Sequence, residues 1–172
     1  MVLEKANLYK ALTQAVAESL ESLAFVEAIL LDEKTPLLPE EQAPKPRTSV
    51  AWARTPFIKP LEGEILLIMP PELGQMLTEI IFGAMGEEKI SDEVMLDAIA
   101  ETSNVVAGRV MNGLIGNHTE FELGLPIRGM GSSDQEVPMP RGTLHKLDYT
   151  IEGYTFTVIL GAKGFEQDRN SK

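Results

Sequence analysis

Asp97, Glu101, Asn104 and Gly108 recur at steps of three or four residues in the middle of the chain. On a helix they form one polar file, in which Glu101 and Asn104 are neighbours. An amide can hold a water molecule by donating one hydrogen bond and accepting another, and a carboxylate can pair with a lysine of a partner protein. Presented on a rigid helix, this pair is suited to positioning a water in another protein's active site. Orientation of that kind is a large part of catalysis in phosphoryl transfer.

The plainer interpretation of the file is a solvated helix face, on which charged residues need no function. Two of its members count against that interpretation. Asn104 lies in the middle of the predicted helix, where its side chain competes with the backbone for hydrogen bonds. Gly108 follows one turn later and costs about 1 kcal/mol relative to alanine. A merely solvated face would more often carry Glu, Lys or Ala at both positions, but these residues alone leave both interpretations open.

Other kinds of site have less support. Asp97 and Glu101 could bind a divalent ion, but two carboxylates alone make a poor site. The run GMGSS at Gly129 opens no predicted helix, so it is not a phosphate-binding loop. His118 and His145 lie far apart in sequence, which gives only weak support for a metal site. The chain has no cysteine, which excludes disulfides, a thiolate nucleophile and cysteine-based zinc sites. We expect the protein to bind no cofactor of its own.

The polar file belongs to the second of two predicted long helices. Ser91 is a suitable N-cap, and Asp92 and Glu93 follow it, where the helix dipole favours carboxylates. We expect Glu101 and Asn104 to be exposed side by side on the outer face, because an apolar stripe of the same period occupies the other side and should face the core. That stripe consists of Met95, Ile99, Thr102, Val106, Val110 and Leu114.

The remaining elements alternate between strands and helices. Periodicity predicts a long first helix over residues 3–31 and a shorter helix from Pro71 to Gly83. Pro126 should end a half-buried strand that carries Leu125 on its apolar face, and residues 129–141 should form a loop. The predicted strands are 50–58, 64–69, 119–125, 143–151 and 154–162. The order αββααβββ indicates an α+β fold, with a largely antiparallel sheet packed against the two long helices.

Length and composition limit the class of protein. The 172 residues suit a single domain over 1–172, with a Pro-rich connector at 34–49 and a frayed tail at 165–172. The formal net charge of −11 argues against nucleic acid or an anionic membrane as a main partner. No apolar run approaches the roughly 18 residues of a membrane span, and no signal peptide opens the chain. We therefore expect a cytoplasmic protein.

One set of residues spans the second long helix and the segments on either side of it: Ile81-Phe82-Gly83, Asp97, Glu101, Asn104, Gly108 and the stretch from Phe121 to Pro126. Together with the order of elements, this set resembles the CheC/CheX family of chemotaxis phosphatases. The first helix carries Glu18 and Glu21 at the corresponding spacing, so it has a carboxylate where the amide would be. The resemblance identifies one active helix, the one with Glu101 and Asn104, which is similar to CheX and unlike family members with two active helices.

The resemblance implies a protein phosphatase that dephosphorylates the phospho-aspartate of a CheY-like response regulator. Asn104 would position the hydrolytic water, and Glu101 would pair with a lysine of the receiver domain. Asp97, Gly108 and Pro126 would belong to the partner-binding surface, with Pro126 shaping a strand end beside the site. Any Mg²⁺ would belong to the receiver. The resemblance also implies a homodimer.

The alternative is a non-catalytic CheX-like binding or scaffold module of a signalling or flagellar switch complex, because flagellar switch proteins use the same fold. The intact pair of Glu101 and Asn104 favours the enzyme, since a pure scaffold has no need of the amide.

Overall fold

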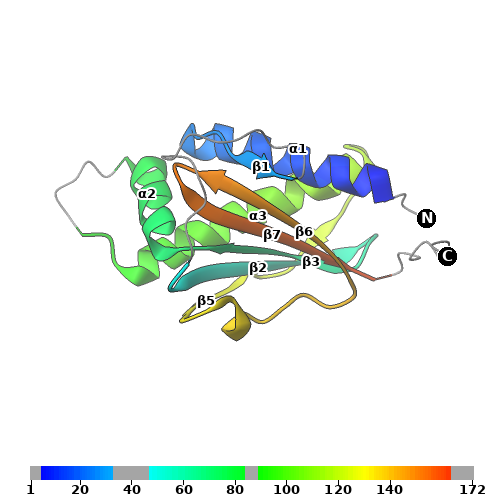
Figure 1. Cartoon of the computed structure of the whole chain (residues 1–172). Coiled ribbons are helices and arrows are strands. Elements are labelled where there is room, and N and C mark those ends of the chain that lie inside the picture. Colours follow the sequence, from blue (N-terminus) through cyan, green and yellow to red (C-terminus); the bar gives the residue numbers. More distant parts are fainter. Residues whose placement is uncertain (1–4, 33–46, 84–88, 164–172) are drawn as a thin grey trace.

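The computed structural model describes residues 5–32, 47–83 and 89–163 (Figure 1). Of the connector predicted at 34–49, only residues 47–49 are among those described. The tail predicted at 165–172 lies outside the described residues.

A seven-stranded antiparallel sheet forms the centre of the molecule. Its strands follow the order β1-β6-β7-β3-β2-β4, and β5 also pairs with β2. The central strands are apolar on both faces, as expected of strands buried from both sides. The strand bounds are β1 Ile29–Leu31, β2 Val50–Lys59, β3 Gly63–Met69, β4 Glu122–Leu123, β5 Ile127–Gly131, β6 Thr143–Ile151 and β7 Tyr154–Ala162.

Three helices complete the described part of the chain. Helices α1 (Lys5–Ala24) and α3 (Asp92–Ile115) lie together along one face of the sheet, and α2 (Pro71–Phe82) packs against α3 at one end (Figure 1). These helices and the sheet face beneath them share one continuous apolar core. The predicted α+β class, with two long helices on a largely antiparallel sheet, is confirmed.

Helix α3 begins and packs as its sequence predicts. The Ser91 hydroxyl accepts a hydrogen bond from the backbone N–H of Val94 at 3.2 Å, which makes Ser91 the N-cap. Leu114, the last member of the predicted stripe, is only half-buried. The other members, Met95, Ile99, Thr102, Val106 and Val110, are all buried. The stripe therefore fixes the rotation of α3 and determines which side of the helix faces the core.

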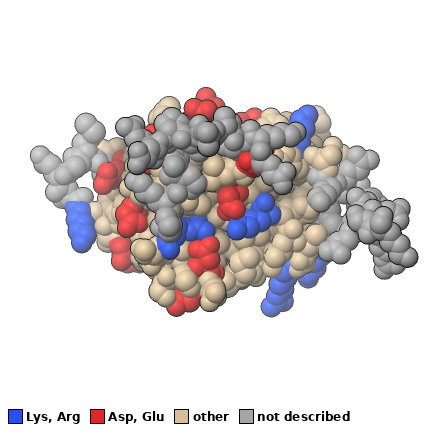
Figure 2. Space-filling view, in the orientation of Figure 1, with Lys and Arg blue, Asp and Glu red and all other residues tan. Residues whose placement is uncertain are grey.

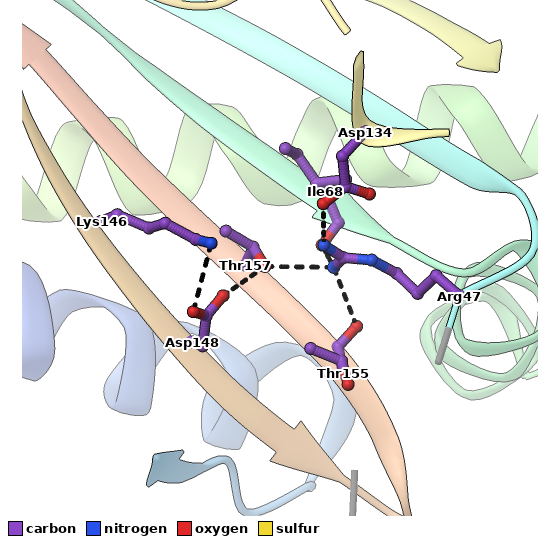
Figure 3. Close-up of polar contacts among 7 residues, drawn as sticks. All are labelled: Arg47, Ile68, Asp134, Lys146, Asp148, Thr155 and Thr157. Atoms are coloured by element: carbon purple, nitrogen blue, oxygen red, sulfur yellow. Dashed lines mark hydrogen bonds and ion pairs between the residues drawn. The ribbon is translucent and has the colours of Figure 1, made fainter. Parts of the chain in front are cut away.

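The sheet face opposite the helices carries a smaller apolar cluster and a polar network. Arg47 reaches across this face (Figure 3), where its Nη1 donates to the carbonyl oxygens of Ile68 and Thr155 and to Thr157 Oγ1 at 3.1–3.3 Å. Its Nη2 pairs with Asp134 on a short 3-10 turn, which fastens that turn to the sheet. The apolar cluster consists of Val50, Trp52, Leu66, Ile68, Val137 and Ile159.

The surface in Figure 2 shows acidic and basic side chains beside one another on one face of the molecule. Among the described residues, ion pairs join several acidic and basic side chains, including Arg54 and Glu64 at 3.4 Å. Within the described residues, no helix combines the length and apolar character that crossing a bilayer requires.

The predicted first helix over 3–31 is too long, because α1 ends at Ala24. Phe25 follows with a left-handed backbone (φ 53°), a conformation that ends helices. The apolar residues after it form β1, which pairs with residues 148–150 of β6. A helical period that continued past Phe25 concealed this short strand.

The predictions for 119–125 and 129–141 are also partly wrong. Only Glu122–Leu123 forms β4, and residues 129–131 of the expected loop belong to β5. The chain leaves the sheet between these strands because Pro126 has no N–H to donate to a neighbouring strand. The last two predicted strands are confirmed with the same bounds.

Candidate functional site

Glu101 and Asn104 lie one turn apart on α3 but in different surroundings. Glu101 is exposed and forms no ion pair with any residue in the described part of the chain. Asn104 is half-buried, so the expectation of full exposure holds for Glu101 and is wrong for Asn104. The difference arises because Asn104 faces the junction between α3 and β2.

Thr55 of β2 anchors the amide of Asn104. Its Oγ1 lies 3.0 Å from Asn104 Oδ1 and 2.8 Å from Ser103 Oγ. Thr55 and Ser103 are fully buried. Sequence analysis did not single out Thr55, although it interrupts an otherwise apolar alternation between Ala53 and Phe57 on the helix-facing side of β2. A threonine among inward-facing apolar residues was the feature of the sequence from which its role could have been predicted.

The segment from Leu123 to Arg128 runs alongside the polar file. At one end, Arg128 Nη2 pairs with Asp97 Oδ1 at 2.6 Å. At the other, a Cβ on Gly108 would lie 4.0 Å from Leu123 Cδ1. The middle of this segment, at Leu125 and Pro126, therefore lies between the two ends of the polar file.

Leu125 occupies that middle position and is 88% exposed. The prediction that it faces inward on a regular strand is wrong, because the chain leaves the β-ladder after Leu123. Gly124 makes this departure possible. Its N–H donates to the Pro56 carbonyl at 2.8 Å, and a Cβ there would lie 2.6 Å from Pro56 Cγ. An apolar side chain therefore stands in solvent on a segment whose two ends lie against the polar file.

Four of the five sequence-predicted residues, Asp97, Glu101, Asn104 and Gly108, lie along α3. Glu101 and Asn104 lie in the middle of this file, and Asp97 is held by Arg128 at one end. Gly108 lies at the other end, and no described side chain requires a glycine there, since an added Cβ would make only an ordinary van der Waals contact with Leu123. Pro126 lies in the gap between β4 and β5. Sequence reasoning missed three contributors: Thr55, Arg128 and the exposed Leu125.

Solved structures of chemotaxis proteins have this fold. CheX from Vibrio vulnificus aligns with a TM-score of 0.68 at 13% identity, over 91% of this chain and 96% of that one. The CheX–CheY–BeF3–Mg²⁺ complex from Borrelia burgdorferi gives a TM-score of 0.65 at 14% identity, over 91% and 97%. FliY from Thermotoga maritima gives 0.57 at 16% identity, over 95% and 93%. No curated protein matches the chain by sequence.

These similarities show that the chain has the α+β fold of these proteins. The sequence model of the family described as "Chemotaxis phosphatase CheX" matches residues 53–138, which is half of the chain. The chain belongs to the CheX family. The matched region contains the whole of α3, Thr55 of β2 and the segment from Leu123 to Arg128.

Proposed function

We propose that this chain is a phosphatase that hydrolyses the phospho-aspartate of a CheY-like response regulator. One observation carries the proposal: an exposed carboxylate, Glu101, which forms no ion pair within the described residues, lies one helical turn from an amide, Asn104, that a buried hydroxyl holds in place. The family is described as chemotaxis phosphatases, and one neighbour was solved as a CheX–CheY complex. Both support a receiver domain as the substrate.

In the proposed reaction, Asn104 enters the receiver's active site and hydrogen-bonds the attacking water. The water oxygen forms a bond to phosphorus, and the bond between phosphorus and the aspartyl oxygen breaks. The aspartate leaves as a carboxylate with the bonding electron pair, and both protons of the water stay with the inorganic phosphate. The amide neither gains nor loses a proton, so its contribution is orientation.

Glu101 is proposed to hold the receiver in register by pairing with a lysine beside its phosphorylation site. A carboxylate that already had an internal partner would have to break that contact first, and Glu101 has none among the described residues. Mg²⁺ bound by the receiver would stabilise the charge of the phosphoryl group. No metal ligand is assigned to this chain, and we expect the reaction in the cytoplasm, where the receiver is phosphorylated.

We further propose that Leu125 is part of the docking surface, with Asp97, Gly108 and Pro126 around it. Leu125→Asp should weaken binding to a receiver about tenfold, because it puts a charge at the centre of a surface that must lose water on docking. Turnover at saturating protein should change little, since Leu125 does not contact the reacting atoms. Titration of a fluorescent receiver loaded with beryllium fluoride, which mimics the phosphoryl group, measures this affinity.

Met139→Asp is the matched control for Leu125→Asp. Met139 is 45% exposed and lies in the segment that Arg54 binds on the opposite sheet face. It should bind receivers as wild type does. Equal losses of affinity in the two variants would remove Leu125 from the docking surface.

We also propose that the protein is a homodimer with two-fold symmetry. Closed two-fold dimers are the commonest oligomers. Among the described residues, strand β1 pairs with residues 148–150 of the nine-residue strand β6, and Leu144 near the other end of β6 is 46% exposed. Sedimentation velocity should give a single species of twice the chain mass at micromolar concentration. A monomer under those conditions contradicts the dimer without affecting the proposed reaction.

A panel of phosphorylated receiver domains provides the first test of the proposed function. Phosphate release from each receiver is measured with and without this protein, in excess Mg²⁺. At least one receiver should lose its phosphoryl group faster when the protein is present. A receiver that binds tightly but is not accelerated would instead favour the scaffold or binding module.

A further inference from the structure

We infer that Thr55 is a positioning residue for the reaction, because its hydroxyl sets which atom of the Asn104 amide faces the receiver. The inference rests on the proposed function and deepens it. Thr55 is fully buried on β2, and its Oγ1 lies 3.0 Å from Asn104 Oδ1. It touches neither substrate nor water, so it acts only through Asn104.

The directions of the hydrogen bonds follow from the chemistry of the groups. An amide oxygen only accepts and a hydroxyl has one hydrogen, so Thr55 must donate to Asn104 Oδ1. The second contact of Thr55, with Ser103 Oγ at 2.8 Å, then requires Ser103 to be the donor. Ser103, Thr55 and Asn104 thus form a relay, which is a short chain of hydrogen bonds from the interior to the surface of α3. The exposed end of this relay is the amide of Asn104.

This relay fixes the orientation of a planar group. With Oδ1 held toward β2, the Nδ2 of Asn104 lies on the other branch of the amide and points away from Thr55. The amide therefore presents its N–H donors to a docked partner. The second lone pair of Oδ1 remains available to accept a further hydrogen bond. An asparagine side chain without this contact would sample both orientations of its amide and several rotamers. Only some of these would place the water in line with the phosphorus–oxygen bond that breaks.

The contact has no equivalent for Glu101, which is exposed. It also differs from the contact that Thr102, a buried hydroxyl on α3, makes. Thr102 donates to the carbonyl of Ala98 in its own helix at 2.9 Å, which is an ordinary local bond. Thr55 and Thr102 are therefore a matched pair: both are buried threonines at the interface of α3, but only Thr55 contacts the candidate catalytic amide.

The test compares Thr55→Val, Thr55→Ser and Thr102→Val in acyl-phosphate decay and in receiver binding. Thr55→Val keeps the shape and removes the hydroxyl. It should lower the turnover rate about tenfold or more at saturation, because a small displacement of the positioning group is costly. Its affinity for a beryllium fluoride-loaded receiver should stay within about twofold of wild type. Thr55→Ser should restore turnover, and Thr102→Val should behave as wild type.

A second readout does not depend on activity. The side-chain amide protons of Asn104, observed by NMR, should shift in Thr55→Val and stay near their wild-type positions in Thr55→Ser and Thr102→Val. If Thr55→Val does not fold, Thr55→Cys replaces it, because the thiol keeps the volume and is a much weaker donor.

Two results would overturn the inference. One is a Thr55→Val turnover rate equal to that of Thr102→Val, while the wild type accelerates dephosphorylation. The other is an unchanged Asn104 amide signal in Thr55→Val. If the wild type accelerates no receiver, the proposed function fails, and the amide signal alone decides whether Thr55 orients Asn104.

Discussion

Replacing Asn104 with alanine should reduce the accelerated loss of acyl phosphate from a receiver at least about a hundredfold, the usual cost of removing a preorganised hydrogen-bonding group that acts in the transition state. Affinity for a beryllium fluoride-loaded receiver should remain close to wild type, because the amide acts on a water rather than on the partner's surface. The measurement is acyl-phosphate decay in excess Mg²⁺ at saturating protein, with binding measured separately.

Asn112→Ala is the matched control for Asn104→Ala, since Asn112 is an exposed asparagine two turns further along the same helix. It should keep wild-type activity. Asn104→Asp provides a sharper comparison, because it keeps the acceptor for the Thr55 hydroxyl but loses the N–H donors. It should be as inactive as the alanine variant. Wild-type turnover by Asn104→Ala would show that the water-positioning mechanism is wrong.

Replacing Glu101 with alanine should have a different effect, a weaker complex together with lower turnover. The proposed ion pair lies across an interface from which water is excluded, where truncating one member of a charge pair typically costs 2–5 kcal/mol in affinity. We therefore expect a loss of affinity of about thirtyfold or more, which corresponds to about 2 kcal/mol. Binding and decay assays at several salt concentrations measure this effect.

Glu21→Ala on α1 is the control for Glu101→Ala. Glu21 is also an exposed helical glutamate, but its helix has no asparagine three residues on. Its loss should leave both assays unchanged. Both glutamate variants should keep the stability of wild type within about 0.5 kcal/mol, as exposed substitutions usually do. If Glu101→Ala binds receivers as tightly as Glu21→Ala, the proposed ion pair does not exist.

Helix α3 could be predicted from the sequence because its signals are local. The Ser91 cap, the acidic first turn and the apolar period all lie within one segment, and they determine where the helix begins and which side is buried. The last hairpin is equally local. Glu152 and Gly153 both adopt positive φ angles of 50° and 81°, which suit the tight turn between its strands. Predictions of this kind need no knowledge of distant neighbours.

The parts that were missed depend on contacts between distant segments. Thr55 is only an isolated polar residue in a strand until the fold brings β2 against Asn104, 49 positions along the chain. The pairing of Arg128 with Asp97 needs β5 to run beside α3, and β5 itself was hidden in a stretch rich in glycine. Leu125 is exposed because Gly124 and Pro126 take the chain out of the sheet, which an alternating pattern does not reveal.

The scaffold alternative and the phosphatase share the fold and the docking surface, and they differ only in what the amide does. The FliY neighbour shows that this fold is not restricted to proteins named CheX. The relay from Ser103 through Thr55 to Asn104 favours the phosphatase, because binding alone gives no reason to fix the orientation of one half-buried amide. Only a reaction rate can separate the two functions.

The most direct test is the single-turnover rate of acyl-phosphate loss from one Mg²⁺-loaded receiver at increasing concentrations of the wild-type protein. If the protein is a phosphatase, the rate should rise with concentration and reach a plateau at least about tenfold above the receiver's own rate. The concentration at half-maximal rate should match the dissociation constant measured for the same pair. A rate that stays at the receiver's own value while binding saturates would contradict the phosphatase function.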